Sequence, residues 1–240
     1  MPWNPSAPIP DQKSRAAPAL AAGPGPAPPA DPSTVLHLVH LGDSSTFLWH
    51  SWFDAAIQTW TSNVRVPNHL SDSAPALATF RNTVYTVHRN FHSNDLVYAW
   101  YNGTTWELSH PIPNQKSKSA PALAEFQGRL HMVHLGDTSN DIWHSSFDGN
   151  AWTPNVRIPA QQSRVSPALC NYGGLFMVHL GNSSNDIWYS RFDGNAWTPN
   201  VRSGLQSQAT PALAVLGGRL FMVHLHVRSN DIFFSTFTND

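Results

Sequence analysis

A segment of nineteen residues occurs twice in this chain of 240 residues, and this repetition constrains the fold more than any other feature. Residues 139–157 read SNDIWHSSFDGNAWTPNVR, and residues 184–202 differ from them at only two positions. Both copies belong to a longer pattern, because the tripeptide Pro-Ala-Leu begins five times, at Pro18, Pro75, Pro121, Pro167 and Pro211. A fixed period of about 45 residues indicates repeated copies of one supersecondary unit.

The unit that begins at Pro121 contains four short runs with the pattern of β-strands. These runs are PALAEF, RLHMVHLG, DIWHSSF and AWTPNVRIP, and the connections FQGR and DGNA carry the glycine that tight hairpins need. Four short strands in about 40 to 50 residues are typical of one blade of a β-propeller. The sequence therefore predicts an all-β, five-bladed β-propeller of four-stranded blades.

The two ends of the chain indicate how this ring closes. The last unit stops after its third run, at NDIFFSTFTND, and lacks a fourth run with a tryptophan. Trp3 lies fifteen residues before Pro18, as Trp152 lies fifteen residues before Pro167. We therefore expect the N-terminal strand to complete the last blade and to remove an unpaired sheet edge. The predicted single domain, residues 1–240, has blades at about residues 18–66, 75–112, 121–158, 167–203, and 211–237 together with 3–9.

The charge and the cysteine content narrow the expected partners and location. Fourteen basic residues stand against fifteen acidic ones, so we expect no basic surface for nucleic acid. No apolar run is long enough to insert into a membrane, and the N-terminal MPWNPSAPIP lacks the pattern of a signal peptide. Cys170 is the only cysteine. We expect a protein that is cytoplasmic or released without a recognisable signal peptide, with oligomers left open.

In a propeller, the loop between the second and third strands and the connection to the next blade emerge on the same rim. The sequence places carboxylate, amide and cationic side chains there, which suit sugar hydroxyls, and aromatic rings can stack on the apolar face of a sugar. Repeated weak sites gain avidity for dense glycans. The candidate ligand-binding residues are Asp43, Asp137, Asn140, Asn182, Asn185, Gln12, Lys13, Gln115, Lys116, Gln161, Gln162, Arg164, Trp52, Trp100, His134 and His179.

These candidates have structural alternatives. Asn140 and Asn185 fit Asx turns equally well. The histidines recur once per unit, which favours buried, hydrogen-bonded rings, and rings related by rotation lie too far apart to share a metal ion. Trp143 and its equivalents occupy a position that is always large and apolar, so we interpret them as core between blades. Trp52 and Trp100 align with polar residues of other units, and we expect them to be exposed.

The units GRLHMVHLGD and SNDIWHSSFDGNAWTPNVRIP resemble the repeats of fungal and bacterial β-propeller lectins, and the five-blade count is similar to that of tachylectin-2-like propellers. The resemblance covers the whole chain at the level of architecture and implies glycan binding without catalysis. We therefore expect a multivalent lectin with fewer than five equivalent, shallow sites between blades, and with glycans or glycoconjugates as partners. The alternative is a propeller that serves as a protein–protein interaction scaffold.

The segment FDGNAW, which spans residues 147–152, resembles the Asp-box of sialidases, and we interpret it as a turn stabiliser. A glycosidase needs two carboxylates about 5 to 10 Å apart. Glu107 and Glu125 lie at unrelated positions of the repeat, and the repeated aspartates single out no one pocket. The sequence therefore predicts that the chain is not an enzyme and uses no cofactor, with a glycosidase as the less favoured alternative.

Overall fold

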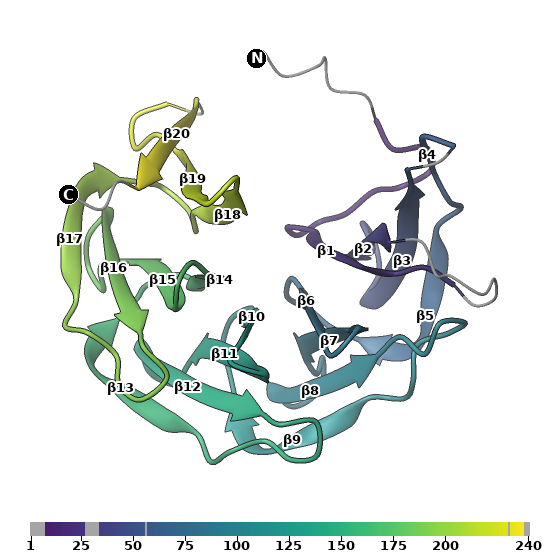
Figure 1. The fold of residues 1–240 in the computed structure, drawn as a ribbon, viewed down its shortest axis with the longest axis horizontal. Helices are drawn as coiled ribbons and strands as arrows, with labels where there is room; N and C mark the ends of the chain where they lie inside the picture. Colours follow the sequence, from purple (N-terminus) through teal and green to yellow (C-terminus); the bar gives the residue numbers. More distant parts are fainter. Residues whose placement is uncertain (1–7, 27–33, 56, 230, 238–240) are drawn as a thin grey trace.

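The computed structural model describes residues 8–26, 34–55, 57–229 and 231–237. In these ranges all of the regular secondary structure is β-strand. The strands form five antiparallel sheets, which are arranged as blades around a ring (Figure 1). The predicted all-β propeller of five blades is confirmed. The described part of the chain contains no helix long and apolar enough to cross a bilayer.

Each blade consists of strands that follow one another in the chain, and its first strand lies nearest the centre of the ring (Figure 1). Blade 1 contains β1 (Ala19–Pro24), β2 (Thr34–Leu41), β3 (Phe47–Asp54), β4 (Thr59–Trp60) and β5 (Val64–Leu70). Blade 2 contains β6 (Ala76–Phe80), β7 (Thr83–Arg89), β8 (Asp95–Trp100) and β9 (His110–Lys116). Blade 3 contains β10 (Ala122–Phe126), β11 (Arg129–Leu135), β12 (Asp141–Phe147) and β13 (Val156–Gln162). Blade 4 contains β14 (Ala168–Asn171), β15 (Leu175–Leu180), β16 (Asp186–Phe192) and β17 (Val201–Gln206), and blade 5 contains β18 (Ala212–Leu216), β19 (Arg219–Leu225) and β20 (Ile232–Phe237).

A bulge interrupts the outermost strand of blades 1 to 4. In blade 3 the pairing of β12 with β13 shifts register, and Ala160 takes a left-handed φ of 55°. Asn114 does the same in β9, with a φ of 56°. Because the strand continues past the bulge, four residues predicted to lie in connections between blades lie instead within β9 and β13: Gln115, Lys116, Gln161 and Gln162. Their prediction as loop residues was wrong.

The apolar core is divided among the interfaces between adjacent blades. Four clusters of buried side chains join blade 1 to 2, 2 to 3, 3 to 4 and 4 to 5. At the interface of blades 2 and 3, for example, the rings of Phe80 and Phe147 lie 6.2 Å apart, and Leu130 and Met132 are fully buried beside them. Burial of apolar surface is the main stabilising term in folding, so each blade depends on its neighbours.

Buried histidines lie in pairs inside blades 1 and 3 and between blades 1 and 2. The ring nitrogens are 3.0 Å apart in His37–His50 and His131–His144, and 3.2 Å apart in His69–His88. Such a contact needs one N–H donor and one bare nitrogen acceptor, so it is lost when both rings are protonated. Burial lowers the pKa of all six rings.

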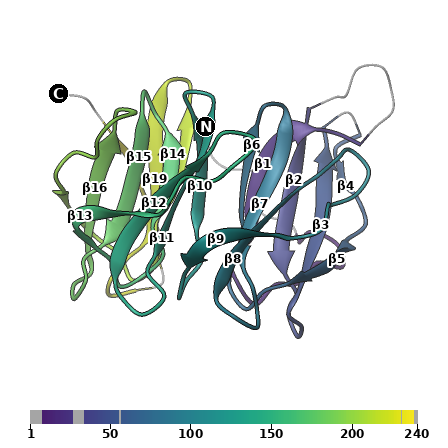
Figure 2. The ribbon, with the colours of Figure 1, turned by 90° about the horizontal axis from the view of Figure 1, so that it is seen from below.

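The blades follow one another around the ring in chain order, and blades 1 and 5 are its first and last members in Figure 1. Figure 2 shows the blades side by side, with their strands running between two rims. Blade 5 has three strands in the described part of the chain, and the predicted closing strand around Trp3 falls on residues outside it. On β20, Ile232 is 72% exposed and Phe234 is 75% exposed, whereas the equivalent Ile142 of blade 3 is fully buried.

Candidate functional site

Two equivalent clefts open on the rim that carries the loops between second and third strands. The blade 3 cleft has a volume of about 770 Å³ and is lined by residues 136–139, Trp143, residues 152–155, and Pro113, Asn114 and Lys116 of β9. The blade 1 cleft has a volume of about 600 Å³ and is lined by residues 42–45, Trp49, residues 60–63, His40, Pro10, Asp11 and Lys13. Each cleft therefore lies between one blade and the chain segment that precedes that blade in the sequence.

A glycine and a tryptophan shape one wall of each cleft. At Gly136 a Cβ atom would lie 3.1 Å from Nε1 of Trp143, and at Gly42 it would lie 2.9 Å from Nε1 of Trp49. Only a residue without a side chain lets the indole approach the loop so closely. The indoles of Trp143 and Trp49 are only partly buried and face the cleft, which gives it an apolar surface.

Charged and amide groups form the rim of the blade 3 cleft. Nδ2 of Asn94, from blade 2, donates to Oδ1 of Asp137 at 3.0 Å. Nζ of Lys116 lies 3.3 Å from Oδ1 of Asp95, and both side chains are about half exposed. An ion pair so exposed contributes little to stability, so the ammonium group of Lys116 can exchange partners at low cost. In blade 1 the corresponding residues are Asp43 and Lys13, and both line the cleft.

The histidine at the end of the second strand has partners at both ring nitrogens in blade 3 and at only one in blade 1. His40 lines the blade 1 cleft, whereas His134 does not itself line the blade 3 cleft. Nδ1 of His134 lies 2.6 Å from the carbonyl oxygen of Leu135, and Nε2 lies 3.2 Å from Oδ1 of Asn155. A carbonyl only accepts, so Nδ1 carries the proton of the neutral ring, and Nε2 pairs with Asn155 when the side-chain amide is turned so that its NH₂ faces the ring. Burial lowers the pKa of His134, which keeps the ring neutral. His179 makes the same two contacts in blade 4.

In blade 1 the equivalent atoms are buried but unpaired. Nδ1 of His40 lies 3.1 Å from the carbonyl oxygen of Leu41. Nε2 of His40 and Oδ1 of Asn63 have no hydrogen-bond partner in the described residues, and both residues line the cleft. Buried polar atoms without a partner are costly, so these two provide an acceptor and an amide that a polar ligand can satisfy.

The equivalent position in blade 4 is bridged by side chains. Nδ2 of Asn182 donates to Oε1 of Gln162 at 3.1 Å, and Oδ1 of Asn182 accepts from Asn140 of blade 3. Arg164 donates to Oδ1 of Asn185 and to the carbonyl oxygen of Ser184 at 3.1 Å. These five predicted ligand-binding residues are thus joined to one another or to backbone and line neither cleft described above.

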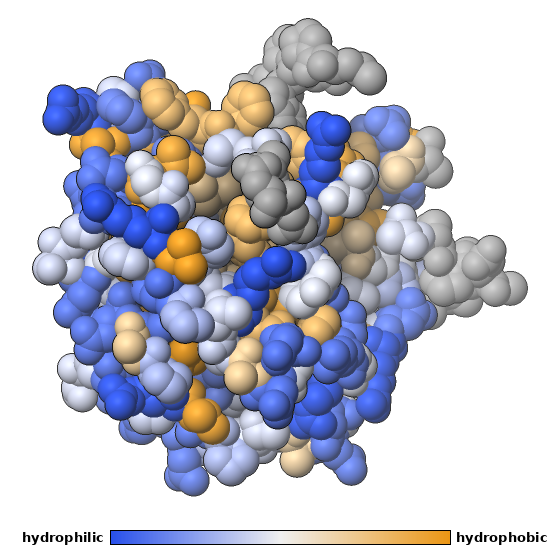
Figure 3. Space-filling view, turned by 60° about the vertical axis from the view of Figure 1, so that its left-hand side comes forward, coloured by the Kyte–Doolittle hydropathy of each residue, from blue (hydrophilic) through white to orange (hydrophobic). Residues whose placement is uncertain are grey.

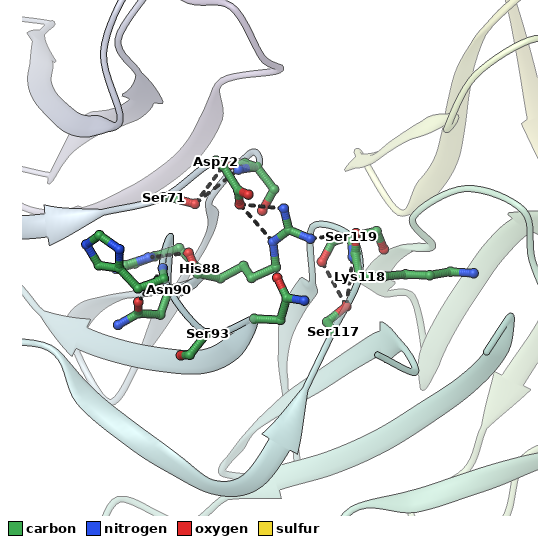
Figure 4. Close-up of polar contacts among 12 residues, drawn as sticks. Ser71, Asp72, His88, Asn90, Ser93, Ser117, Lys118 and Ser119 are labelled. Atoms are coloured by element: carbon green, nitrogen blue, oxygen red, sulfur yellow. Dashed lines mark hydrogen bonds and ion pairs between the residues drawn. The ribbon is translucent and has the colours of Figure 1, made fainter. Parts of the chain in front are cut away.

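In blade 2 the corresponding loop is held by polar contacts with the segments around it (Figure 4). The loop carries Asn90 where blade 3 has Gly136. The guanidinium group of Arg89 pairs with Asp72 at 2.5 Å and donates to the carbonyl oxygen of Lys118 at 2.8 Å (Figure 4). Through these two contacts Arg89 links the segment before blade 2 to the segment before blade 3, so its guanidinium group serves the fold.

Three glutamines among the predicted ligand-binding residues hold the outer strands to the next blade. Oγ of Ser145 donates to Oε1 of Gln115 at 2.8 Å, and Oγ of Ser190 donates to Oε1 of Gln161 at 2.9 Å. Gln12 is bonded to Ser51 of blade 1 in the same way. Gln115 and Gln161 are buried, so these amides serve the framework.

Trp52 and Trp100 do not line either cleft. Both are half-buried on the third strands of blades 1 and 2. The ring of Trp100 stacks on His110 at 5.1 Å, and the ring of Trp52 lies 5.5 Å from His50. They are therefore less exposed than the sequence predicted.

The residues that the sequence analysis missed are the tryptophans of the clefts. Trp49 and Trp143 were interpreted as core, but they line the two clefts together with Trp60 and Trp152. A signal was present in the sequence, because the Leu-Gly step precedes this tryptophan only in blades 1, 3 and 4. Blades 2 and 5 carry Val97 and Phe233 at this position.

The FDGNAW turns have the structural role that the sequence analysis favoured. Oδ1 of Asp148 accepts from the backbone N–H groups of Asn150 and Ala151 at 2.8 and 2.9 Å. Asp193 accepts two equivalent bonds in blade 4. These bonds lower the pKa of both carboxyl groups, since they stabilise the ionised form.

No model of a known protein family matches this chain, and no curated protein sequence matches it. Solved structures do. The fucose-specific lectin from Aleuria aurantia aligns with a TM-score of 0.67 and 12% identity over 92% of this chain and 74% of that one. The Hadza microbial sialidase Hz136 aligns with a TM-score of 0.63 and 13% identity over 91% and 51% of the two chains. The GH43 β-xylosidase/α-arabinofuranosidase CoXyl43, from a compost microbial metagenome, aligns with a TM-score of 0.56 and 11% identity over 92% of each chain.

These likenesses establish the β-propeller fold and correct one prediction. The sequence analysis predicted that the chain is not an enzyme, but glycosidases and a sialidase align with it about as well as a lectin does. The exclusion of catalysis was therefore wrong. The chain spans about half the length of the sialidase and of a Bacteroides ovatus GH43 protein, at 51% and 53%.

Proposed function

We propose that this chain binds carbohydrate in the blade 1 and blade 3 clefts. The observation that carries the proposal is the shared composition of the two clefts. Each combines a partly exposed indole, a carboxylate and an ammonium group, supplied in blade 3 by Trp143, Asp137 and Lys116. A sugar needs an aromatic surface for its C–H face, and acceptors and donors for its hydroxyl groups.

The unpaired atoms of blade 1 add support. Nε2 of His40 and Oδ1 of Asn63 are both acceptors, so each can take a hydrogen bond from one ligand hydroxyl. Two hydroxyl groups of one sugar can therefore satisfy both buried atoms, and we expect the blade 1 cleft to bind a single sugar more tightly than the blade 3 cleft.

The similar structures agree in the chemistry of what they recognise. By their names, one binds fucose, one is a sialidase and one is a xylosidase, so each handles a sugar. The lectin was also solved with α-methyl-L-fucoside, which makes fucosylated glycans a reasonable first probe.

The proposal is tested on a glycan array, followed by calorimetry with the best monosaccharide. We expect two sites per chain, with dissociation constants in the range of about 10 μM to 1 mM that is usual for small polar ligands. Glycan-free protein surfaces and an unrelated propeller serve as controls. Absence of any glycan on the array, or a stoichiometry that Trp143→Ala leaves unchanged, would contradict the proposal.

Glycoside hydrolysis is the second candidate, and one observation favours it. Asp11 and Asp43 both line the blade 1 cleft, so one cleft holds the two carboxylates that most glycosidases use. Turnover of a panel of aryl glycosides tests this function. If hydrolysis occurs, Asp11→Asn and Asp43→Asn should each reduce its rate at least about 100-fold, and Asp11→Asn should do so without loss of sugar binding. If no glycoside is hydrolysed, the blade 1 cleft is a binding site only.

A further inference from the structure

A tryptophan occupies the same place at three successive blade interfaces. The ring of Trp152 lies 5.3 Å from Phe147 at the end of the third strand in its own blade, and 5.8 Å from Tyr98 on the third strand of the preceding blade. The corresponding distances are 5.7 and 5.4 Å for Trp106, and 5.3 and 5.5 Å for Trp197. Each of these indoles therefore fills the space between two third strands.

At the interface of blades 4 and 5 the two flanking rings are present without an indole. Tyr189 and Phe237 lie 5.6 Å apart, close to the 5.2 Å of Tyr98 and Phe147. In place of a tryptophan, the described residues leave a cavity of about 240 Å³ that both rings line, together with Met222 and Ser235. The interface of blades 4 and 5 thus contains a fourth position that an indole can fill, between Tyr189 and Phe237.

The segment that enters blade 1 already has the geometry of an outermost strand. Asp11 has a φ of 55°, as Asn114 and Ala160 have at the bulges of β9 and β13. Gln12 bonds to Ser51, as Gln115 bonds to Ser145. Residues 9–14 therefore repeat the end of a fourth strand, although in the described residues they are paired with no third strand of blade 5.

The spacing along the chain predicts which tryptophan fills this cavity. Trp106 and Trp152 each lie eight residues before their bulge residue, and Trp3 lies eight residues before Asp11. In complete blades the residue four before the bulge pairs with the third strand, as Val156 pairs with His144. The same register pairs Ala7 with Phe234 and places Trp3 beside Phe237.

The exposed apolar side chains of blade 5 match this arrangement. Apolar side chains gather at the upper edge of Figure 3, where blade 5 lies. On β20, Phe234 is 75% exposed and Ile232 is 72% exposed. Their equivalents in blade 4, Tyr189 and Ile187, both pack into the interface with the next blade, blade 5. Completion of blade 5, so that its β20 face packs on the next blade of the ring, would cover apolar surface that is otherwise left in water.

We propose that residues 3–9 of this same chain dock on β20 as the fourth strand of blade 5, and that the Trp3 indole fills the cavity between Tyr189 and Phe237. This docking joins the two ends of the chain and lets blade 5 pack on blade 1. It is independent of the proposed carbohydrate binding.

The register is tested by disulfide formation in the full-length chain with Cys170→Ala. Directly opposed residues in an antiparallel pair have Cα atoms about 4.5 to 5.5 Å apart, within the range of a disulfide. We expect Ala7→Cys with Phe234→Cys to form an intramolecular bridge in most molecules after mild oxidation, as measured by mass spectrometry of non-reduced peptides. The pair Tyr98→Cys with His110→Cys, at the same register in blade 2, is the positive control.

Ser6→Cys with Phe234→Cys is the matched negative control, because the side chain of an adjacent residue leaves the opposite face of a strand. Equal bridging by Ser6 and Ala7, or no bridge where the blade 2 pair forms one, would overturn the proposal. Disulfide-linked dimers would also overturn it and would show that a second copy supplies the strand. As an independent measurement, Trp3→Ala should lower the melting temperature by roughly 10 °C, and Trp3→Phe by less.

Discussion

Acidification from neutral pH to about pH 4.5 is expected to remove roughly 11 kcal/mol of stability, which is comparable to the whole stability of a typical domain. Burial, with the charge of a neighbouring ring, lowers the pKa of His50, His88 and His144 to about 3. In the unfolded chain these rings take up a proton near pH 6.5, whereas the folded chain resists protonation until about pH 3. Stability is therefore complete above about pH 6.5 and falls as the pH is lowered toward 3.

The magnitude follows from linkage. Each ring with a folded pKa of about 3 costs about 1.4 kcal/mol per pH unit below 6.5, or about 2.7 kcal/mol at pH 4.5. Three such rings, one from each histidine pair, give about 8 kcal/mol, and His131, whose pKa burial lowers to about 4, adds about 2.6 kcal/mol. Urea unfolding followed by tryptophan fluorescence at about pH 7, 5.5 and 4.5 measures it as a falling midpoint.

The chain supplies its own control for this prediction. Blade 4 carries Phe176 and Tyr189 where blade 3 carries His131 and His144, and these two rings stack at 5.3 Å. The variant His131→Phe with His144→Tyr should therefore fold, and its loss of stability at pH 4.5 should be smaller by about 5 kcal/mol, because it removes two rings of lowered pKa. An unchanged loss in this variant would show that the acid sensitivity arises elsewhere.

The fold was predictable from the sequence because the same strand and turn pattern occurs in five units of the chain. Each blade carries the same alternation and the same hairpin glycines, so an ambiguous run in one unit is resolved by its equivalents. The ends of the outer strands were not predictable in this way. Asn114 and Ala160 hold the same left-handed conformation with unrelated side chains, so no residue type marks the bulge that carries Gln115 and Gln161 into strands.

The site was predictable in its location and only in part in its residues. Asp43 and Asp137, with Lys13 and Lys116, do line clefts between blades. The tryptophans beside them were read as core because a large apolar residue recurs at their position. The sequence cannot show that Gly136 lets an indole lie against a loop and remain open to a cleft.

Other candidate residues are bonded to neighbouring blades and line neither cleft. The sequence could not show this, because a polar side chain uses the same chemistry to bind a ligand and to bind a neighbouring blade. Gln161 satisfies Ser190, whereas Gln162, the next residue, reaches across to Asn182. Adjacent residues in a strand face opposite sides, so one is buried and the other lies on the rim. Only the register of the strand, which the bulge displaces, decides which role each takes.

Removal of the cleft tryptophans is expected to have the largest effect on binding. Trp49→Ala and Trp143→Ala should each reduce the number of sugar sites per chain from two to one, because each removes the apolar wall of one cleft. Binding to a dense glycan surface should then weaken by about 100-fold or more, since two linked sites gain avidity that one site lacks. The double variant should not bind at all.

Trp188→Ala is the matched control for these variants, since Trp188 occupies the same position in blade 4 beside Gly181. There the side chains of Gln162 and Asn182 are bonded to each other at 3.1 Å, so no sugar site is expected and the stoichiometry should stay at two. Calorimetry with the monosaccharide and surface plasmon resonance on the immobilised glycan measure the two quantities. If Trp188→Ala lowers binding as much as Trp143→Ala does, the loss reflects damage to the ring of blades, and the sugar does not bind in the clefts.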